Sequence, residues 1–372
     1  PGLPGNANEL TENMRNTDGK ISLDGKRIAG RRRSGEAGSA LVAVLCLVFL
    51  GGMLAAAVAG MTLISTLDMA AHTEIQRSFY INEGVLNRVS FLISADRDQN
   101  GRNPVLGDVD YEEYEYDRFL QDGVLHEVDY YGYKVLVTVY DAISGWDLSS
   151  DSNRYRNTLR TFTSDLDTEQ DVIDAVNDLA VRIADYIDTD DTVATGTVSG
   201  TDSAEGMEKD DYESEGMRPL PRNGAMQYRE ELYYIKGLTD FFPPDRFGRL
   251  SSIRLIPPSG TVILNGTPSF FSAPPEMISL LGDLEDDELA AVLAAREKLR
   301  KERIQISDEL DTGVAAKLQR NMSWTSSNYY TVVIGPSPRS RRPSKRLSAS
   351  FGALEISGAS GEVQEYLEWV SY

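Results

Sequence analysis

The feature that most constrains this chain is an uninterrupted apolar segment, Ser39–Ile64. No charged residue occurs between Glu36 and Asp68. Because about 20 apolar residues cross the hydrocarbon core of a bilayer, the segment predicts a membrane-spanning helix whose backbone groups hydrogen bond within the helix. Three arginines, Arg31–Arg33, precede it. Their positive charge predicts that the N-terminal side is cytoplasmic and that the long C-terminal part lies across the membrane.

The helical pattern continues beyond the apolar segment. Apolar residues recur at helical spacing as far as Ile93, and no proline interrupts them. One interpretation is a single helix over residues 39–95, roughly 85 Å long at 1.5 Å per residue. Its first half would lie in lipid, and its amphipathic second half would pack on a soluble domain. A single-pass anchor followed by a separate helix fits the same pattern.

Composition excludes several classes of protein. The chain has 372 residues, enough for two domains, and a net charge of −21. Its one cysteine, Cys46, lies inside the apolar segment, so a disulfide framework is excluded. The two histidines, His72 and His126, are far apart, which argues against a histidine-rich centre.

The first 38 residues predict a disordered cytoplasmic leader. They show no periodicity and carry seven Lys/Arg and five Asp/Glu. A secretory signal peptide is the competing interpretation, but its apolar core would be about 7–15 residues, much shorter than this segment.

Beyond residue 95, strand patterns enclose helical ones. Residues 96–130 are acidic and rich in tyrosine, which predicts a loop with at most a short helix. Tyr133–Tyr140 alternates apolar and polar residues and is the first clear strand. Helices are expected over residues 172–187 and 290–303, and a helical stretch between them covers residues 218–250 and is broken at Gly237 and Pro243-Pro244. Three further strands are predicted near the end of the chain: Tyr329–Ile334, Leu347–Ile356 and Val363–Val370.

Clustered carboxylates are the main candidates for chemistry. Four of them follow one predicted helix end, and two more come from the acidic loop after it. These candidate metal ligands are Asp185, Asp188, Asp190, Asp191, Glu208 and Asp211. Hard oxygen ligands in a flexible loop suit Ca²⁺, although the spacing is not that of an EF-hand. A solvated acidic loop is the alternative interpretation, since a chain this acidic would contain one anyway.

Catalysis and nucleic-acid binding find little support. No nucleophile–base motif or phosphate-binding loop occurs, so we do not expect an enzyme. Ile235–Leu238 is similar to a helix-hairpin-helix turn, in which the backbone holds a phosphate. A net acidic chain lacks the basic surface that nucleic-acid binding needs, so we expect none.

The start of the apolar segment resembles type IV pilin-like proteins. Gly38 is followed by SALVAVLCLVFL after a basic stretch. In that family a prepilin peptidase cleaves after such a glycine, which implies a processing site between Gly38 and Ser39. Most members carry a glutamate five residues after the cut, where this chain has Ala43. The missing charge is similar to the minor pseudopilin K family of type II secretion.

Four further motifs resemble that family in order and spacing. They are D-Y-I-D-T-D at 185–190, G-M-E at 206–208 with Tyr212, E-L-Y-Y-I-K-G at 231–237, and L-N-G-T at 264–267 with Ala273-Pro274 and Arg296. Tyr186 stands where the family has tryptophan, and Gly266 interrupts the last motif.

The resemblance implies an α+β fold, in which a long N-terminal transmembrane and amphipathic helix packs on an antiparallel pilin-like sheet that carries an inserted all-α domain. The implied boundaries are 1–38 for the leader, 39–95 for the long helix with 39–64 in the membrane, 96–145 and 321–372 for the pilin-like domain, and 146–320 for the helical insertion. Calcium sites occur in the helical region of this family.

The implied function is that of a minor pseudopilin at the tip of the type II secretion pseudopilus, held by one span in the bacterial inner membrane with its C-terminal domain in the periplasm. Expected partners are the other minor pseudopilins of a tip complex, the prepilin peptidase and the inner-membrane secretion platform. A charge in lipid is usually partnered, so a subunit without one at Ala43 need not sit below another. A minor pilin of a type IV pilus is the alternative, and a membrane-anchored helix-hairpin-helix protein is a more distant one.

Overall fold

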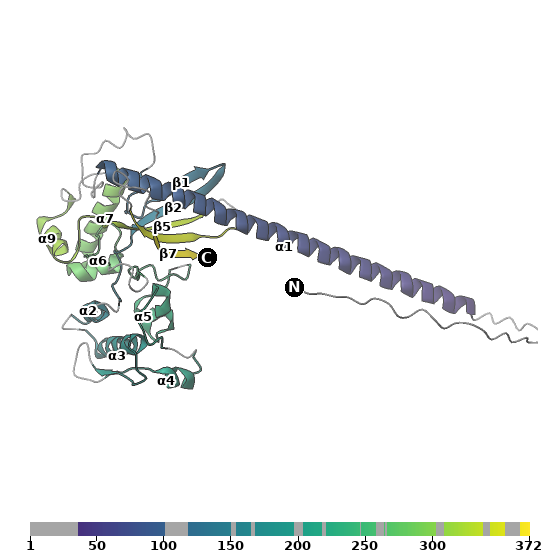
Figure 1. The fold of residues 1–372 in the computed structure, drawn as a ribbon, viewed down its shortest axis with the longest axis horizontal. Helices are drawn as coiled ribbons and strands as arrows, with labels where there is room; N and C mark the ends of the chain where they lie inside the picture. Colours follow the sequence, from purple (N-terminus) through teal and green to yellow (C-terminus); the bar gives the residue numbers. More distant parts are fainter. Residues whose placement is uncertain are drawn as a thin grey trace, which may run out of the picture. The chain divides into compact units, whose positions relative to one another are not determined.

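The structure is a computed structural model (Figure 1). It describes residues 36–100, 118–149, 154–164, 168–196, 204–217, 221–245, 247–257, 264, 266–302, 309–337, 343–353 and 365–372. The predicted leader, 1–38, lies outside these residues except for its last three. The chain divides into two compact units between Leu67 and Asp68, and each is described here by itself.

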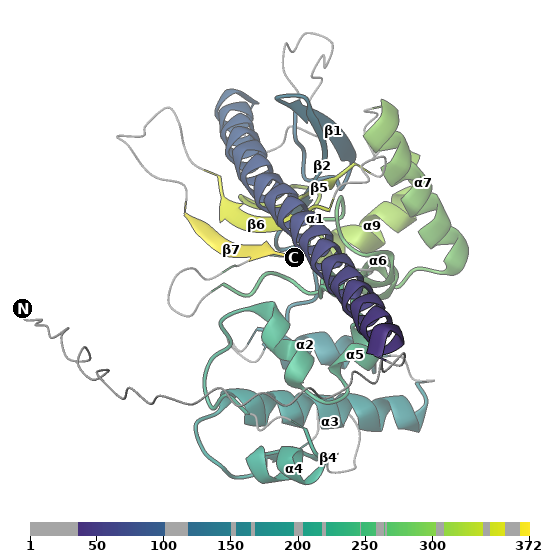
Figure 2. The same ribbon diagram turned by 90° about the vertical axis from the view of Figure 1, so that its right-hand side faces the viewer.

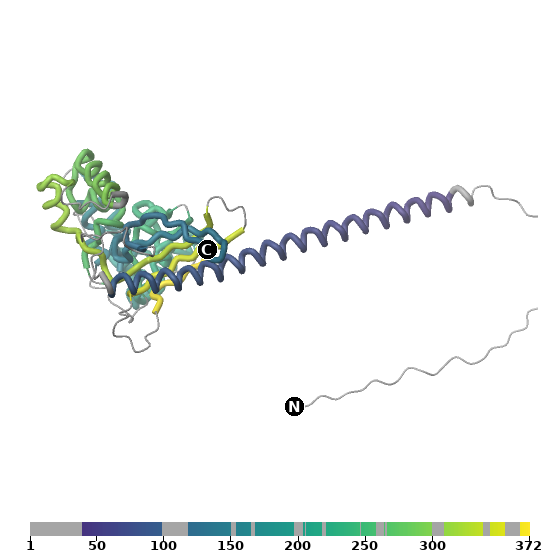
Figure 3. The backbone as a smooth tube through the Cα atoms, turned by 90° about the horizontal axis from the view of Figure 1, so that it is seen from above, coloured from purple at the N-terminus to yellow at the C-terminus, as the bar shows by residue number. Residues whose placement is uncertain are grey.

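One continuous helix, α1 (Glu36–Asn100), spans 65 residues and confirms the single-helix interpretation (Figure 3). In the first unit its apolar side chains are exposed all round; Val48, for example, is 70% exposed. The helix is long and apolar enough to cross a membrane. Water is a poor solvent for such a surface, whereas hydrocarbon suits it.

The second unit contains a five-stranded antiparallel sheet in the order β1-β2-β5-β6-β7 (Figure 2). Its strands are β1 (Leu125–Tyr130), β2 (Tyr133–Asp141), β5 (Tyr329–Pro336), β6 (Leu347–Gly352) and β7 (Tyr366–Ser371). The predicted strand over 133–140 is confirmed as β2. The three predicted C-terminal strands overlap β5, β6 and β7, but β5 and β7 extend past the predicted ends, and residues 354–356 and 363–364 of the predictions lie outside the described part of the chain. The register places Val139 opposite Val332, and Val332 opposite Ala349.

Strand β1 corrects the prediction of a loop over residues 96–130. It pairs with β2 around a two-residue turn, Tyr131-Gly132, in which both residues have positive φ, 52° and 80°. Such turns match the twist of paired strands. The sequence pattern misses β1 because an edge strand is half exposed and needs few apolar residues.

The part of α1 within the second unit covers one face of the sheet. Its residues Val85, Leu86, Val89 and Ile93 are buried in one apolar cluster with the valines of β2 and β5. Period-2 alternation sends the neighbouring residues to the other face, where several polar side chains are also buried. They are Thr138, Thr331, Ser348, Ser350 and Glu368.

The chain between β2 and β5 forms helices, although those two strands are neighbours in the sheet. They are α2 (Arg154–Thr161), α3 (Gln170–Ile187), α4 (Lys209–Ser214), the 3₁₀ helix η3 (Arg229–Tyr234), α5 (Leu238–Phe241), α6 (Pro275–Gly282), α7 (Asp286–Glu302) and α9 (Thr312–Asn321). They enclose a second apolar cluster that includes Leu179, Phe242 and Val292. A small pair of strands, β3 (Thr195–Gly196) and β4 (Ala204–Glu205), also lies here, so this region is not purely helical.

Candidate metal centre

Helix α3 places two carboxylates at its C-terminal end. Its apolar face, with Leu179 and Ile183, is fully buried in the second apolar cluster. Asp185 lies at the buried end of this face and is 0% exposed, and Asp188 is the C-cap residue. Negative charge at a helix C-terminus opposes the helix dipole, so both carboxylates occupy an unfavourable position unless a cation compensates them.

The short strands β3 and β4 bring a third carboxylate to this helix end. The backbone N–H of Ala194 donates to Asp185 Oδ1 at 2.8 Å, and Gly206 N donates to Ala194 O at 3.0 Å. A Cβ on Gly206 would lie 1.8 Å from Asp185 Oδ2, so only glycine lets the chain pass this close to the carboxylate. Glu208 follows two residues later.

Asp185, Asp188 and Glu208 form one group, in which one carboxylate oxygen from each lies within 4.8 Å of the others. Four oxygens are buried without a hydrogen-bond partner: Asp185 Oδ2, Asp188 Oδ1 and both oxygens of Glu208. Among the described residues no lysine or arginine forms an ion pair with any of the three. Buried unpaired carboxylates are costly, so the group requires either protons or a cation.

Burial and mutual repulsion raise the pKa of all three carboxyl groups. Burial is the main cause for Asp185 and Asp188, and neighbouring aspartates add to it. For Glu208, burial and then the charges of Asp185 and Asp188 raise the pKa from 4.5 to about 7. Like charges held at short distance disfavour ionisation, and a bound cation reverses that effect.

The three carboxylates lie close enough together to contact one ion. Carboxylate oxygens bind hard divalent cations at about 2–2.6 Å, so two ligands of one ion are at most about 5 Å apart. One oxygen from each of the three residues meets this condition. The group could therefore bind a metal ion, in agreement with the cluster predicted from the sequence.

The other predicted ligands have separate partners. Asp190 Oδ1 accepts from Thr192 N at 2.8 Å in a local turn, and Asp211 Oδ2 accepts from Glu208 N at 2.9 Å at the start of α4. Asp191 Oδ1 accepts from the side-chain amide of Asn223 at 3.1 Å. These three are therefore not members of the group.

Asn223 lies beside the acidic helix end, a neighbour that sequence reasoning missed. Its amide nitrogen also donates to Asp190 O at 3.0 Å, and its amide oxygen is buried without a partner. The residue has a positive φ of 51° beside Gly224. The Asn-Gly pair predicts a turn, but nothing local indicates that this turn lies beside the acidic helix end.

The remaining motif residues have structural roles. Glu231 is buried, accepts from the Tyr186 hydroxyl at 3.1 Å, and pairs with Arg222 at 2.6 Å. Arg296 donates to Ala273 O at 2.7 Å, which ties α7 to the chain before α6. Gly237 adopts a φ of 85° at the start of α5.

The other predicted site residues lie in α1. The implied processing site, Gly38 and Ser39, falls at the beginning of the helix, and Ala43 lies one turn further along. His72 is also in α1, whereas His126 is in β1 and contacts the ring of Phe119.

Comparison with protein-family models found no matching family, and a search of curated proteins found no similar sequence.

Proposed function

We propose that this chain is a minor pseudopilin at the tip of the type II secretion pseudopilus, a structural component for protein export across the outer membrane. The observation that carries the proposal is helix α1. One uninterrupted helix joins an exposed apolar half to a half that belongs to the core of an antiparallel sheet. A subunit built in this way is stored in a membrane and later joins a fibre through the same apolar surface.

The position at the tip rests on two features. In the first turns of α1, Ala43 stands where most pilin-like proteins carry a glutamate. The charge of that glutamate would need a partner in a neighbouring subunit. The helices between β2 and β5 add bulk to the part of the chain that holds the sheet. Both features favour a subunit that has a neighbour on one side along the fibre axis. The other minor pseudopilins and the inner-membrane secretion platform are the proposed partners, with the sheet and helices in the periplasm.

A calcium ion at Asp185, Asp188 and Glu208 belongs to the same proposal. Bound there, the ion would supply positive charge at the C-terminal end of α3 and hold the β3–β4 pair against it. The four unpartnered carboxylate oxygens support an ion at this position. Its role would be structural, because its ligands come from two segments of the chain, the end of α3 and the residues that follow β4.

The proposal is tested by N-terminal sequencing of the full chain after expression with a prepilin peptidase. We expect a mature chain that begins at Ser39, and we expect Gly38→Leu to block cleavage, because the peptidase requires a residue without a side chain before the cut. Ser39→Ala is the matched control and should be cleaved. An uncut wild-type chain, or a cut elsewhere, would contradict the proposal.

Purification of the cleaved protein together with its bound partners distinguishes a type II secretion pseudopilus from a type IV pilus. Cleaved protein should co-purify with minor pseudopilins encoded beside a secretin and a secretion ATPase. Capture of type IV pilus subunits in their place would favour the alternative, a minor pilin, which shares the helix and the processing step.

A further inference from the structure

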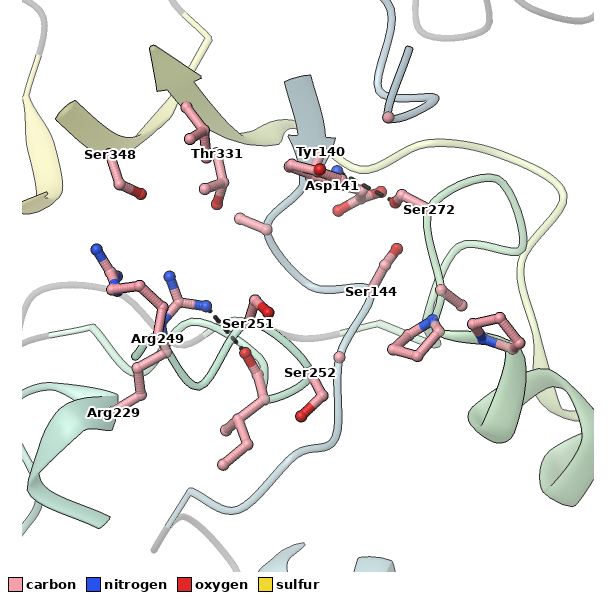
Figure 4. Close-up of a pocket in the computed structure, with 18 of the residues that line it drawn as sticks. Tyr140, Asp141, Ser144, Arg229, Arg249, Ser251, Ser252, Ser272, Thr331 and Ser348 are labelled. Atoms are coloured by element: carbon pink, nitrogen blue, oxygen red, sulfur yellow. Dashed lines mark hydrogen bonds between the residues drawn. The ribbon is translucent and has the colours of Figure 1, made fainter. Parts of the chain in front are cut away.

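A second site lies on the sheet face that α1 does not cover. A cavity of about 440 Å³ separates this face from the loops around η3 and α6, and buried polar groups line it (Figure 4). Ligand pockets in proteins commonly measure about 300–1,000 Å³. At roughly 30 Å³ per water molecule, the space is far larger than one structural water needs.

The walls carry hydroxyl groups that protein contacts leave unused. Ser348 is 3% exposed, yet its hydroxyl has no partner among the described residues, and Figure 4 shows it directed toward the cavity. Ser252 Oγ is likewise buried without a partner. Ser348 therefore presents a hydroxyl to whatever fills the cavity, and Ser252 Oγ is a buried polar atom that the described residues leave unsatisfied.

Two further serines present donors. Ser144 Oγ accepts from Ser269 N at 2.9 Å, and Ser272 Oγ accepts from Asp141 N at 3.2 Å. Neither hydroxyl donates to a protein acceptor within the described part of the chain, so both hydrogens are available. The wall therefore offers several hydroxyl groups at fixed positions, which suits a ligand that has many hydroxyl oxygens.

The charges beside the cavity are balanced. Arg229 and Arg249 both pair with Glu368, at 2.9 and 3.2 Å, and Arg249 Nε also lies 2.7 Å from Glu230. Arg296 also lines the cavity and donates to Ala273 O at 2.7 Å, so that with Asp141 three guanidinium groups and three carboxylates lie around it. Asp141 is also satisfied, since its carboxylate accepts from Ser327 N and Oγ at 2.7 and 2.6 Å. This balance favours a neutral ligand over an anion.

Two tyrosines complete the lining, Tyr140 of β2 and Tyr372 beside Arg249. An aromatic ring combines an apolar surface with a hydroxyl group, and such rings suit a ligand with one apolar face and a polar edge. From this combination we propose that the cavity binds a neutral saccharide of one or two rings.

The proposal is tested by saturation-transfer NMR and calorimetry on the full chain. The protein is held in phosphatidylcholine nanodiscs, because sugar-based detergents would compete. The probes are D-glucose, maltose and the anionic sugar glucuronate. We expect saturation transfer to glucose or maltose and weaker binding of glucuronate. Preferential binding of glucuronate, or transfer to none of the three sugars, would overturn the proposal.

Variants at Ser348 locate the binding. Ser348→Leu replaces the hydroxyl with a larger apolar side chain that projects into the cavity, and it should abolish the signal. Ser348→Ala removes one hydrogen bond and should weaken binding by about three- to tenfold. Ser164→Leu, at an exposed serine outside the cavity, is the matched control and should bind as wild type does. If Ser348→Leu fails to fold, as judged by its melting transition, Ser348→Ala decides the question. Unchanged affinity in Ser348→Ala would then refute binding at this site.

Discussion

Glu208→Gln should change the stability of the protein in opposite directions with and without calcium. In the ion-free protein the raised pKa means that the folded state binds more protons than the unfolded state between pH 4.5 and about 7. Stability from this group is therefore greatest below pH 4.5, falls as the pH rises through that window, and is lowest above about 7.

The magnitude follows from the pKa of Glu208. A rise from 4.5 to about 7 corresponds to at most about 3–4 kcal/mol at 1.36 kcal/mol per pKa unit. Solvent screening lowers this figure, so we expect about 1–3 kcal/mol. Glutamine carries no charge, and its amide can donate to the unpartnered oxygens of Asp185 and Asp188. In excess chelator at about pH 8, Glu208→Gln should therefore be the more stable protein by that amount.

Calcium should reverse this order. An ion at a hundred times its dissociation constant stabilises a folded protein by about 2.7 kcal/mol, and the variant has lost one ligand. Tryptophan fluorescence during thermal unfolding measures the difference, at about 2–4 °C per kcal/mol. Glu213→Gln, at an exposed glutamate of α4, is the matched control and should change little in either condition. A variant less stable than wild type in chelator, together with no effect of calcium on wild type, would refute the reasoning.

Two further predictions concern contacts around this centre. Gly206→Ala should abolish the calcium-dependent rise in melting temperature, because the added Cβ would lie 1.8 Å from Asp185 Oδ2. Gly224→Ala is the control and should retain the rise, because a Cβ there meets nothing within 4 Å. Tyr186→Phe should lower the free energy of unfolding by about 1 kcal/mol while leaving the calcium response intact, because it removes one hydrogen bond to Glu231 and no metal ligand. Chemical denaturation with and without calcium measures both, and a lost calcium response in Tyr186→Phe would contradict the second.

Elements with a strong local pattern could be predicted from the sequence. The apolar first half of helix α1 follows from a segment without charge or proline, whereas the sequence left open whether the helix continues beyond it. Strand β2 follows from alternation over Tyr133–Tyr140. Helix α3 follows from its apolar face, and the same periodicity places Asp185 and Asp188, three residues apart, on one side of its end. In each case the spacing of apolar residues within a few helical turns or one strand is enough to identify the element.

What the sequence determined by itself was thus the membrane-compatible helix, the strands with a repeating pattern and an acidic helix end. The tertiary structure alone decided that Glu208 joins Asp185 and Asp188 while Asp190, Asp191 and Asp211 do not. It also brought Ser348 of the sheet to the same cavity as residues of the helical region. The physical reason is that these contacts join chain segments that are far apart in sequence. Packing and loop closure determine which segments come together, and neither process produces a periodic pattern in the sequence of either segment.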